Sequence, residues 1–238
     1  MAEPAVRDTF QRVETKYRLT DAVREDLFAE TGPHLLPDVY GKSTVCSLYL
    51  DTPNRLLIRN SIEAKVYKEK LRLRSYGTPG EESRVFLEIK KKYRGVVYKR
   101  RVVMPLHAAR AYLAGGEAPV RSQVMAEIDY AMRLYGHPQP AMLIAYEREA
   151  YTAGEAPGLR LTVDAGVRFR AEDLLLEHGH TGQTILPPGV CLLEVKSAGA
   201  MPLWLSHALD RRGIFPVSFS KYGTAHRMTM QAQTVTTA

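Results

Sequence analysis

The 238-residue sequence lacks the short motifs of several common nucleotide and hydrolase sites. It contains no GxxxxGKS/T phosphate-binding loop and no GxGxxG dinucleotide fingerprint, which excludes P-loop and Rossmann nucleotide sites. The zinc-binding motif HExxH and the nucleophile motif GxSxG are also missing. The seven histidines are scattered along the chain, so a histidine metal site is not expected.

Cysteines and long apolar runs are scarce as well. Cys46 and Cys191 each lie in a strand-like run without a CxxC or Cys/His pattern, so we expect reduced, buried thiols and a cytoplasmic protein. No apolar run approaches the ~20 residues of a membrane span, and the N-terminal segment lacks the apolar core of a signal peptide. Residues 231–238 are expected to form a disordered tail.

Positive charge is abundant and concentrated in one segment. The formal net charge is +7, and residues 65–101 alone hold 13 Lys/Arg against 4 Asp/Glu. The remainder of the chain is therefore slightly acidic. Such a local excess favours an anionic partner without naming one.

Charged residues recur at every second position of several short strands. The sets are Lys68, Lys70, Arg72 and Arg74; Glu88, Lys90 and Lys92; Lys99 and Arg101; Tyr146 and Arg148; and Glu194 and Lys196. Residues at this period share one face of a strand, and the opposite faces are apolar, as at Leu71, Leu73 and Leu87. We expect the apolar faces to pack outward against helices and the charged faces to line a closed interior, which would suit a polyanion.

The order of the predicted elements indicates the architecture. About eight strands follow one another with short, mostly hairpin-like connections, and neither an internal repeat nor a domain linker is present. This pattern predicts an α+β fold in which a closed eight-stranded antiparallel β-barrel has helices packed outside. Residues 1–230 are expected to form this single domain.

Two of the charged patterns indicate a specific chemistry. The like charges from Lys68 to Arg74 repel one another unless an anion or counter-charges lie among them, and the arginine fork donates two hydrogen bonds to phosphate. Residues 86–90 and 193–196 share an apolar-Glu-apolar-Lys form. Their glutamates could hold a divalent cation or balance charge as internal ion pairs, and the sequence leaves both open.

Taken in order, these motifs resemble the VTC domain, the polyphosphate polymerase domain of the vacuolar transporter chaperone complex. Its wider group is the triphosphate tunnel metalloenzymes, alongside the CYTH-type triphosphatases. The matching stretches are 14–18, 47–52, 70–76, 86–90, 98–101, 146–151, 193–196 and 219–222. Each is weak alone, but the ordered set spans nearly the entire chain and is specific.

The resemblance implies an eight-stranded tunnel enzyme that binds ATP by its triphosphate. The γ-phosphoryl group would pass to orthophosphate or polyphosphate with the help of Mn²⁺ or Mg²⁺. Pattern and resemblance together assign catalytic roles to Lys16, Arg72, Arg74, Lys90, Arg148 and Glu194. The predicted substrate-binding residues are Lys70, Lys99, Arg101, Tyr146, Lys196, Ser220 and Lys221. Glu194 is the predicted metal ligand, with Glu14 and Glu88 as further candidates.

The chain departs from the family pattern at two points. Lys16 replaces the second acidic residue of the ExExK opening in CYTH triphosphatases, which favours polymerisation over hydrolysis. The fused SPX domain and membrane helices of the eukaryotic complex are absent, so a separate membrane protein is a candidate partner that would hold the chain at the inner face of a membrane.

Three other functions compete with a polymerase. The first is a triphosphate or polyphosphate hydrolase, and the second is a non-catalytic polyphosphate sensor. The third, a nucleic-acid binder, should stack bases on exposed aromatic side chains. Because Tyr49, Tyr76 and Phe86 lie within strand patterns, no nucleic-acid partner is expected. The sequence leaves the oligomeric state open.

Overall fold

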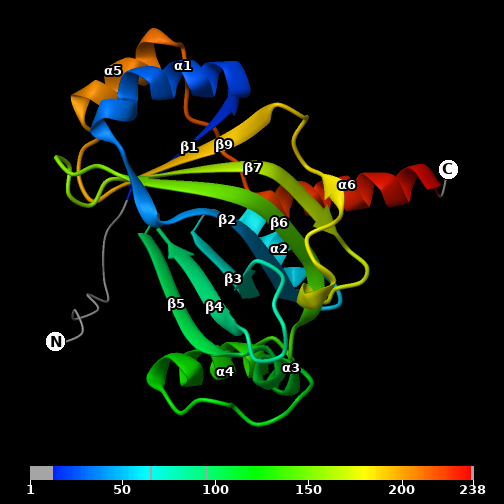
Figure 1. The fold of residues 1–238 in the computed structure, drawn as a ribbon. Helices are drawn as coiled ribbons and strands as arrows, with labels where there is room; N and C mark the ends of the chain where they lie inside the picture. Colours follow the sequence, from blue (N-terminus) through cyan, green and yellow to red (C-terminus); the bar gives the residue numbers. More distant parts are fainter. Residues whose placement is uncertain (1–12, 65, 95, 237–238) are drawn as a thin grey trace, which may run out of the picture.

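The computed structural model describes residues 13–64, 66–94 and 96–236, which form one antiparallel sheet with helices around it (Figure 1). The strands are β1 (Val13–Thr20), β2 (Leu36–Asp51), β3 (Tyr67–Tyr76), β4 (Arg84–Tyr93), β5 (Val96–Pro105), β6 (Gln139–Thr152), β7 (Arg160–Arg170), β8 (Gln183–Thr184) and β9 (Val190–Ser197). The helices are α1 (Asp21–Thr31), α2 (Leu56–Glu63), α3 (Leu106–Leu113), α4 (Gln123–Leu134), α5 (Leu203–Arg211) and α6 (Lys221–Thr236). The predicted α+β class with antiparallel strands is confirmed.

The predicted closure of the strands into a barrel is not confirmed. The strand order is β1-β9-β7-β6-β2-β3-β4-β5, with β8 beside β7, and in the described part of the chain no ladder joins β1 to β5. The Val217 N–H donates to the Lys16 carbonyl at 2.7 Å, so the segment before α6 runs against β1. Side chains bridge the ends instead, since Lys90 Nζ on β4 lies 3.2 Å from Glu14 Oε2 on β1. The sheet is therefore curled and open.

The outward-facing side of the curled sheet carries two apolar cores. One joins Leu71, Leu87 and their neighbours on β2–β5 to α3 and α4. The other joins Leu161, Leu193 and their neighbours on β1, β7 and β9 to α1 and α5. In Figure 1 these helix pairs lie at opposite ends of the molecule. The predicted outward packing of the apolar faces is confirmed.

The inner face, which carries Arg72 and Glu194, is covered in part by α6. Tyr222 of this helix stacks on Tyr49 with ring centroids 4.4 Å apart, and its hydroxyl donates to Asp51 Oδ2 at 2.8 Å. A third apolar core lies here between β2, β6, β7, α2 and α6. Helix α6 continues to Thr236, so residues 231–236 are helical where a disordered tail was expected. The inner face thus has an apolar part beneath α6 and a charged part at the start of that helix.

Candidate active site

Nine cationic side chains converge on the charged part of the inner face, which we call the basic face. They come from β1, β3, β4, β5, β6, β9 and the first residue of α6. They are Lys16, Lys70, Arg72, Arg74, Lys90, Lys99, Arg148, Lys196 and Lys221, and the carboxylates among them are Glu14, Glu88, Asp164 and Glu194. Nine positive charges against four negative ones leave a local excess of five. The structure therefore brings together nearly all of the predicted site residues.

Glu88 gathers the cations of β3 and β5. This carboxylate is 1% exposed and lies 2.7 Å from Arg72 and 2.5 Å from Lys99. Burial alone would raise the pKa of Glu88, but Arg72, Arg74 and Lys99 lower it to about 2. Glu88 thus fixes the cations of β3 and β5 as their ion-pair partner, and its predicted role as a metal ligand stays a prediction.

Asp164 holds cations in the same way on the other side of the basic face, and it is not among the predicted site residues. The residue is fully buried. It accepts two hydrogen bonds from Arg148 at 2.6 and 2.7 Å and one from Lys221 at 2.5 Å. Burial opposes ionisation, yet Lys221 and Arg148 hold its pKa below the usual range. Thr162 and Asp164, two polar residues at period two in an apolar strand, were the available signal.

Glu14 and Glu194 are neighbouring carboxylates on the basic face. Lys196 Nζ lies 3.0 Å from Glu194 Oε2 and 3.8 Å from Glu14 Oε1. Burial favours the neutral form of Glu194, but the hydrogen bond with Glu14 and the nearby cations lower its pKa. Lys90 Nζ also lies 3.2 Å from Glu14 Oε2, and Lys16 and Arg148 lie 4.0 and 3.8 Å from Glu194, so cations surround this pair of carboxylates. Within the described residues no group of three or more His, Cys, Asp or Glu side chains meets.

Three cations of the basic face make their closest contacts in the described structure with neutral groups, although Lys16 and Arg74 also lie 4.0 and 3.9 Å from Glu194 and Glu88. Lys70 donates to the Ser220 hydroxyl at 2.9 Å, and Lys16 donates to the Phe219 carbonyl at 2.9 Å. Arg74 donates to the hydroxyls of Ser47 and Tyr146. Burial is the main cause that lowers the pKa of Lys16 and brings that of Lys70 to about 8. These cations have the greatest need of a negative ligand.

Two tyrosines complete the basic face. Tyr146, a predicted residue, lies beneath the cations of Arg148 and Lys221, 5.1 and 4.5 Å from its ring centroid, a favourable cation–π arrangement. Tyr49 was not assigned a role from the sequence. Burial would raise its pKa, but Arg72, Lys70 and Arg74 outweigh burial and lower it to about 7. The lowered pKa of Tyr49 thus reflects the strong positive charge of the basic face.

Arg101 is the predicted site residue that stands apart. It lies opposite Glu88 in the β4–β5 ladder, but its guanidinium lies over the Phe86 ring, 5.1 Å from the centroid. The side chain is exposed, and it joins none of the carboxylate clusters described above. Arg101 therefore lies at the rim of the basic face.

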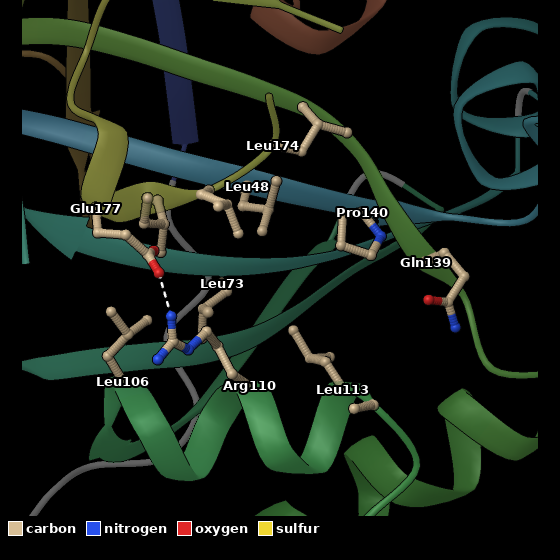
Figure 2. A pocket seen from close by; sticks show the side chains of 12 residues that line it. Leu48, Leu73, Leu106, Arg110, Leu113, Gln139, Pro140, Leu174 and Glu177 are labelled. Atoms are coloured by element: carbon tan, nitrogen blue, oxygen red, sulfur yellow. Dashed lines mark hydrogen bonds and ion pairs between the residues drawn. The ribbon is translucent and has the colours of Figure 1, made fainter. Parts of the chain in front are cut away.

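A cavity of about 220 Å³ lies on the opposite, outward side of the sheet. Figure 2 shows Leu106 and Leu113 of α3 directed toward Leu48 and Leu73, with Arg110 paired to Glu177 at the margin. Because the lining is apolar and Arg110 is already neutralised by Glu81 and Glu177, this cavity is unsuited to a polyanion.

Comparisons with known proteins agree with this geometry. A family model described as the VTC domain matches residues 11–230, whereas no curated protein is significantly similar. A proposed adenylate cyclase from Vibrio parahaemolyticus superposes with a TM-score of 0.53 at 12% identity, over 92% of this chain and 99% of that one. One from Bacillus halodurans gives 0.54 at 12% identity, over 88% and 95%.

A third solved structure is a proposed adenylyl cyclase from Hippeastrum that is described as having dominant triphosphatase activity. It gives a TM-score of 0.50 at 15% identity, over 89% of this chain and 93% of that one. At these identities the likeness shows the fold alone. The described helices include none that is long and apolar enough to cross a membrane.

Proposed function

The chain belongs to the VTC domain family, and from this premise we propose that it is a metal-dependent polyphosphate polymerase. The basic face would bind the triphosphate of ATP, and the γ-phosphoryl group would pass to orthophosphate or to the end of a polyphosphate chain. The observation that carries this proposal is the excess of nine cations over four carboxylates on one face. A triphosphate supplies negative charge of the size that this excess requires.

The two buried carboxylates would orient the phosphate clamp. Glu88 fixes Arg72, and Asp164 fixes Arg148 and Lys221, so these cations are already positioned before a ligand binds. Preorganised charge stabilises a transition state because no reorganisation is needed as negative charge develops. Lys70 and Arg74, which hydrogen-bond only to hydroxyls, would turn to phosphate oxygens.

Glu14 and Glu194 would hold the divalent cation. Mg²⁺ is commonly bound through one or two carboxylates together with substrate phosphates and water, and the placing of Lys196 between these two carboxylates fits a cation site of that kind. When bound, the metal ion would neutralise charge on the phosphate oxygens.

The proposed reaction needs no general base. An anionic oxygen of the acceptor phosphate attacks the γ-phosphorus, and the bond from that phosphorus to the β-phosphate bridging oxygen breaks. The electron pair leaves with ADP, so charge and atoms balance. The residues of the basic face would align the acceptor oxygen with the γ-phosphorus. Phosphoryl transfer depends mainly on such positioning and on charge stabilisation.

A triphosphate hydrolase is the second candidate, supported by the fold shared with the Hippeastrum protein described as a triphosphatase. The small acidic set favours the polymerase, because Lys16 occupies the position of a carboxylate in the hydrolase motif and the described residues hold no cluster of three metal ligands. A non-catalytic polyphosphate sensor would use the same cations. A membrane partner at the inner face of a membrane stays a prediction.

The test is an assay of the purified full chain with ATP and Mn²⁺ or Mg²⁺, with and without a short polyphosphate primer. Gel electrophoresis and phosphorus NMR should show long phosphate chains and ADP. ADP with only free phosphate would identify a hydrolase, and tight polyphosphate binding without turnover would identify a sensor. Glu194→Gln should abolish metal-dependent turnover, whereas Glu155→Gln, an exposed carboxylate paired with His34, should not.

A further inference from the structure

The rim of the basic face carries a cluster in which Tyr76, Arg101 and Val103 are exposed and Phe86 is half-buried. Tyr76 at the end of β3 meets Phe86 of β4 edge to face, with ring centroids 5.6 Å apart. Arg101 of β5 lies over the same Phe86 ring, and Val103 pairs with Phe86 in the β4–β5 ladder. We call Tyr76, Phe86, Arg101 and Val103 the aromatic platform.

The platform is continuous with the phosphate-binding cations. Tyr76 follows Arg74 by two residues on β3, and Phe86 is the direct ladder partner of Arg74. Residues two apart on a strand share a face at a spacing of about 7 Å. A ligand whose anionic part reaches Arg72 and Arg74 would therefore extend over Tyr76 and Phe86.

A structural role in the core does not account for these side chains. Tyr76 is 51% exposed and Val103 is 44% exposed, and neither Tyr76 nor Phe86 belongs to any of the three apolar cores. Within residues 13–64, 66–94 and 96–236, Arg101 forms no ion pair. Single exposed apolar residues are ordinary, but here two rings and a guanidinium meet beside the most positive part of the molecule.

We propose that the aromatic platform binds the nucleobase of a nucleoside triphosphate. Aromatic rings and arginine guanidinium planes both stack on the flat face of a base. No buried donor or acceptor of the platform is aimed at a base edge, so the site accepts any base and prefers those that stack best. This inference rests on the proposed function, because it takes the triphosphate of the same ligand to lie on the basic face.

The test compares two ligands that share phosphates but differ in the base. Isothermal titration of the full chain measures the affinity for ATP and for inorganic tripolyphosphate. Tyr76→Ser should weaken ATP binding about fivefold to 150-fold, the range of one base–aromatic stack, and leave tripolyphosphate binding within twofold. Phe86→Leu, which keeps apolar volume but removes the ring under Arg101, should act in the same direction.

Tyr98 provides the matched control. It is 44% exposed but pairs with Lys91 on the outward side of the sheet, so Tyr98→Ser should change neither affinity. If wild type and both platform variants bind ATP with equal affinity, the platform does not bind the nucleobase. Tripolyphosphate binding, and with it the proposed function, would not be affected by that result. Equal weakening of both ligands would also overturn nucleobase binding by the platform. If wild type binds no tripolyphosphate, the proposed function itself fails.

Discussion

Asp164 is the residue that best shows how the basic face is kept together. Arg148 and Lys221 both end on its fully buried carboxylate, so its removal leaves two cations facing each other in a region of low polarity. We expect Asp164→Asn to lower the free energy of unfolding by about 3–5 kcal/mol, the usual effect of breaking a buried ion pair. Urea denaturation measures this loss.

The exposed ion pair between His34 and Glu155 gives the comparison for Asp164. Glu155→Gln should change the free energy of unfolding by less than about 1 kcal/mol, because exposed pairs contribute little. Equal stabilities of the Asp164→Asn and Glu155→Gln variants would contradict the anchoring role. Added tripolyphosphate should restore part of the stability of Asp164→Asn, since it supplies negative charge to the same cations.

Arg72 and Arg74 lie on the same face of β3 but have different partners. Arg72 forms an ion pair at 2.7 Å with buried Glu88, whereas Arg74 hydrogen-bonds to hydroxyls and lies 3.9 Å from that carboxylate. Arg74→Ala should therefore lower kcat/KM about 10²–10³-fold, as the loss of a charge-stabilising donor does, with a smaller loss of stability than Arg72→Ala. Turnover assays and urea denaturation of both variants separate the effects. Near-normal turnover of Arg74→Ala would refute its place in the clamp.

Lys70 makes anion binding sensitive to pH. Its pKa is lowered to about 8, first by burial, so the charge that attracts phosphate is lost as pH rises through 8. A bound anion raises that pKa again, and the affinity for tripolyphosphate should fall by up to about tenfold per pH unit above 8. Titrations from pH 6.5 to 9.5 measure the slope.

The variant Lys70→Arg keeps its charge throughout this range, because the guanidinium stays protonated, and its affinity should decline less steeply. A residual slope is expected from Lys99, whose pKa is also lowered to about 8, mainly by burial. Tyr49, with a pKa of about 7, adds to it because its phenolate repels the anion. The exposed Lys42 serves as control, and Lys42→Arg should follow wild type. A pH-independent affinity of wild type would contradict the assignment of Lys70 to the phosphate site.

At the scale of elements, the period-two patterns of charge correctly predicted which residues share the inner face. Single polar residues in apolar strands did not reveal their roles. Residues 190–197 form β9, and the period-two positions Lys70, Arg72, Glu88 and Glu194 face inward because a strand alternates its faces. Glu69 and Lys91 lie between such positions and pair with each other on the outward side. Asp164 lies inside β7 without a run of charged residues at period two around it, so the sequence carries no strong signal for its role. Periodicity predicts the face of the strand on which a side chain lies. It does not predict which residue of a distant strand forms an ion pair with that side chain.

Helix α6, which runs from Lys221 to Thr236, organises the inner face. Its weakly amphipathic sequence has few local signals, and tertiary contacts through Tyr222 and Ala225 stabilise it. The predicted closure of the barrel was not confirmed for a related reason. The chain segment that lies along β1 follows α5 and lacks any strand pattern, so only the folded arrangement shows that Val217 hydrogen-bonds to Lys16.

Ser220 links the start of α6 to the basic face. Its hydroxyl accepts from the Gly223 N–H at 3.1 Å, as a helix cap does, and also from Lys70 at 2.9 Å. Ser122 caps α4 by the same bond to Met125 N–H at 3.1 Å but lies away from the basic face. Ser220→Ala and Ser122→Ala should each cost about 1 kcal/mol of stability, and only the first should change ATP affinity or turnover.

Thermal unfolding and ATP titration of both cap variants test this link. The shared loss of stability controls for the helix cap, so any difference in ATP affinity reflects the contact between Ser220 and Lys70. Identical ATP affinities for the two variants would show that α6 covers the inner face without taking part in ligand binding.

The whole molecule is an open, curled sheet whose inner charges are only partly balanced. Five uncompensated positive charges repel one another across the basic face, and the bridge between the two ends of the sheet is the ion pair of Lys90 with Glu14. A polyanion would supply the missing charge and contact cations of β1, β3 and β6 together. Ligand binding should therefore stabilise the fold as a unit, not one strand pair.

Binding of a polyanion across the sheet should give a large thermal shift. At a tripolyphosphate concentration 100 times its Kd, binding to the folded state should add about 2.7 kcal/mol to the free energy of unfolding, and each kcal/mol raises the Tm of a chain this long by about 2–4 °C. Sodium chloride at equal ionic strength should give a smaller rise, because screening weakens repulsion without bridging the strands. Scanning calorimetry measures both shifts. The same rise with chloride as with tripolyphosphate would mean that the basic face is simply screened, and that no built phosphate site joins the two ends of the sheet.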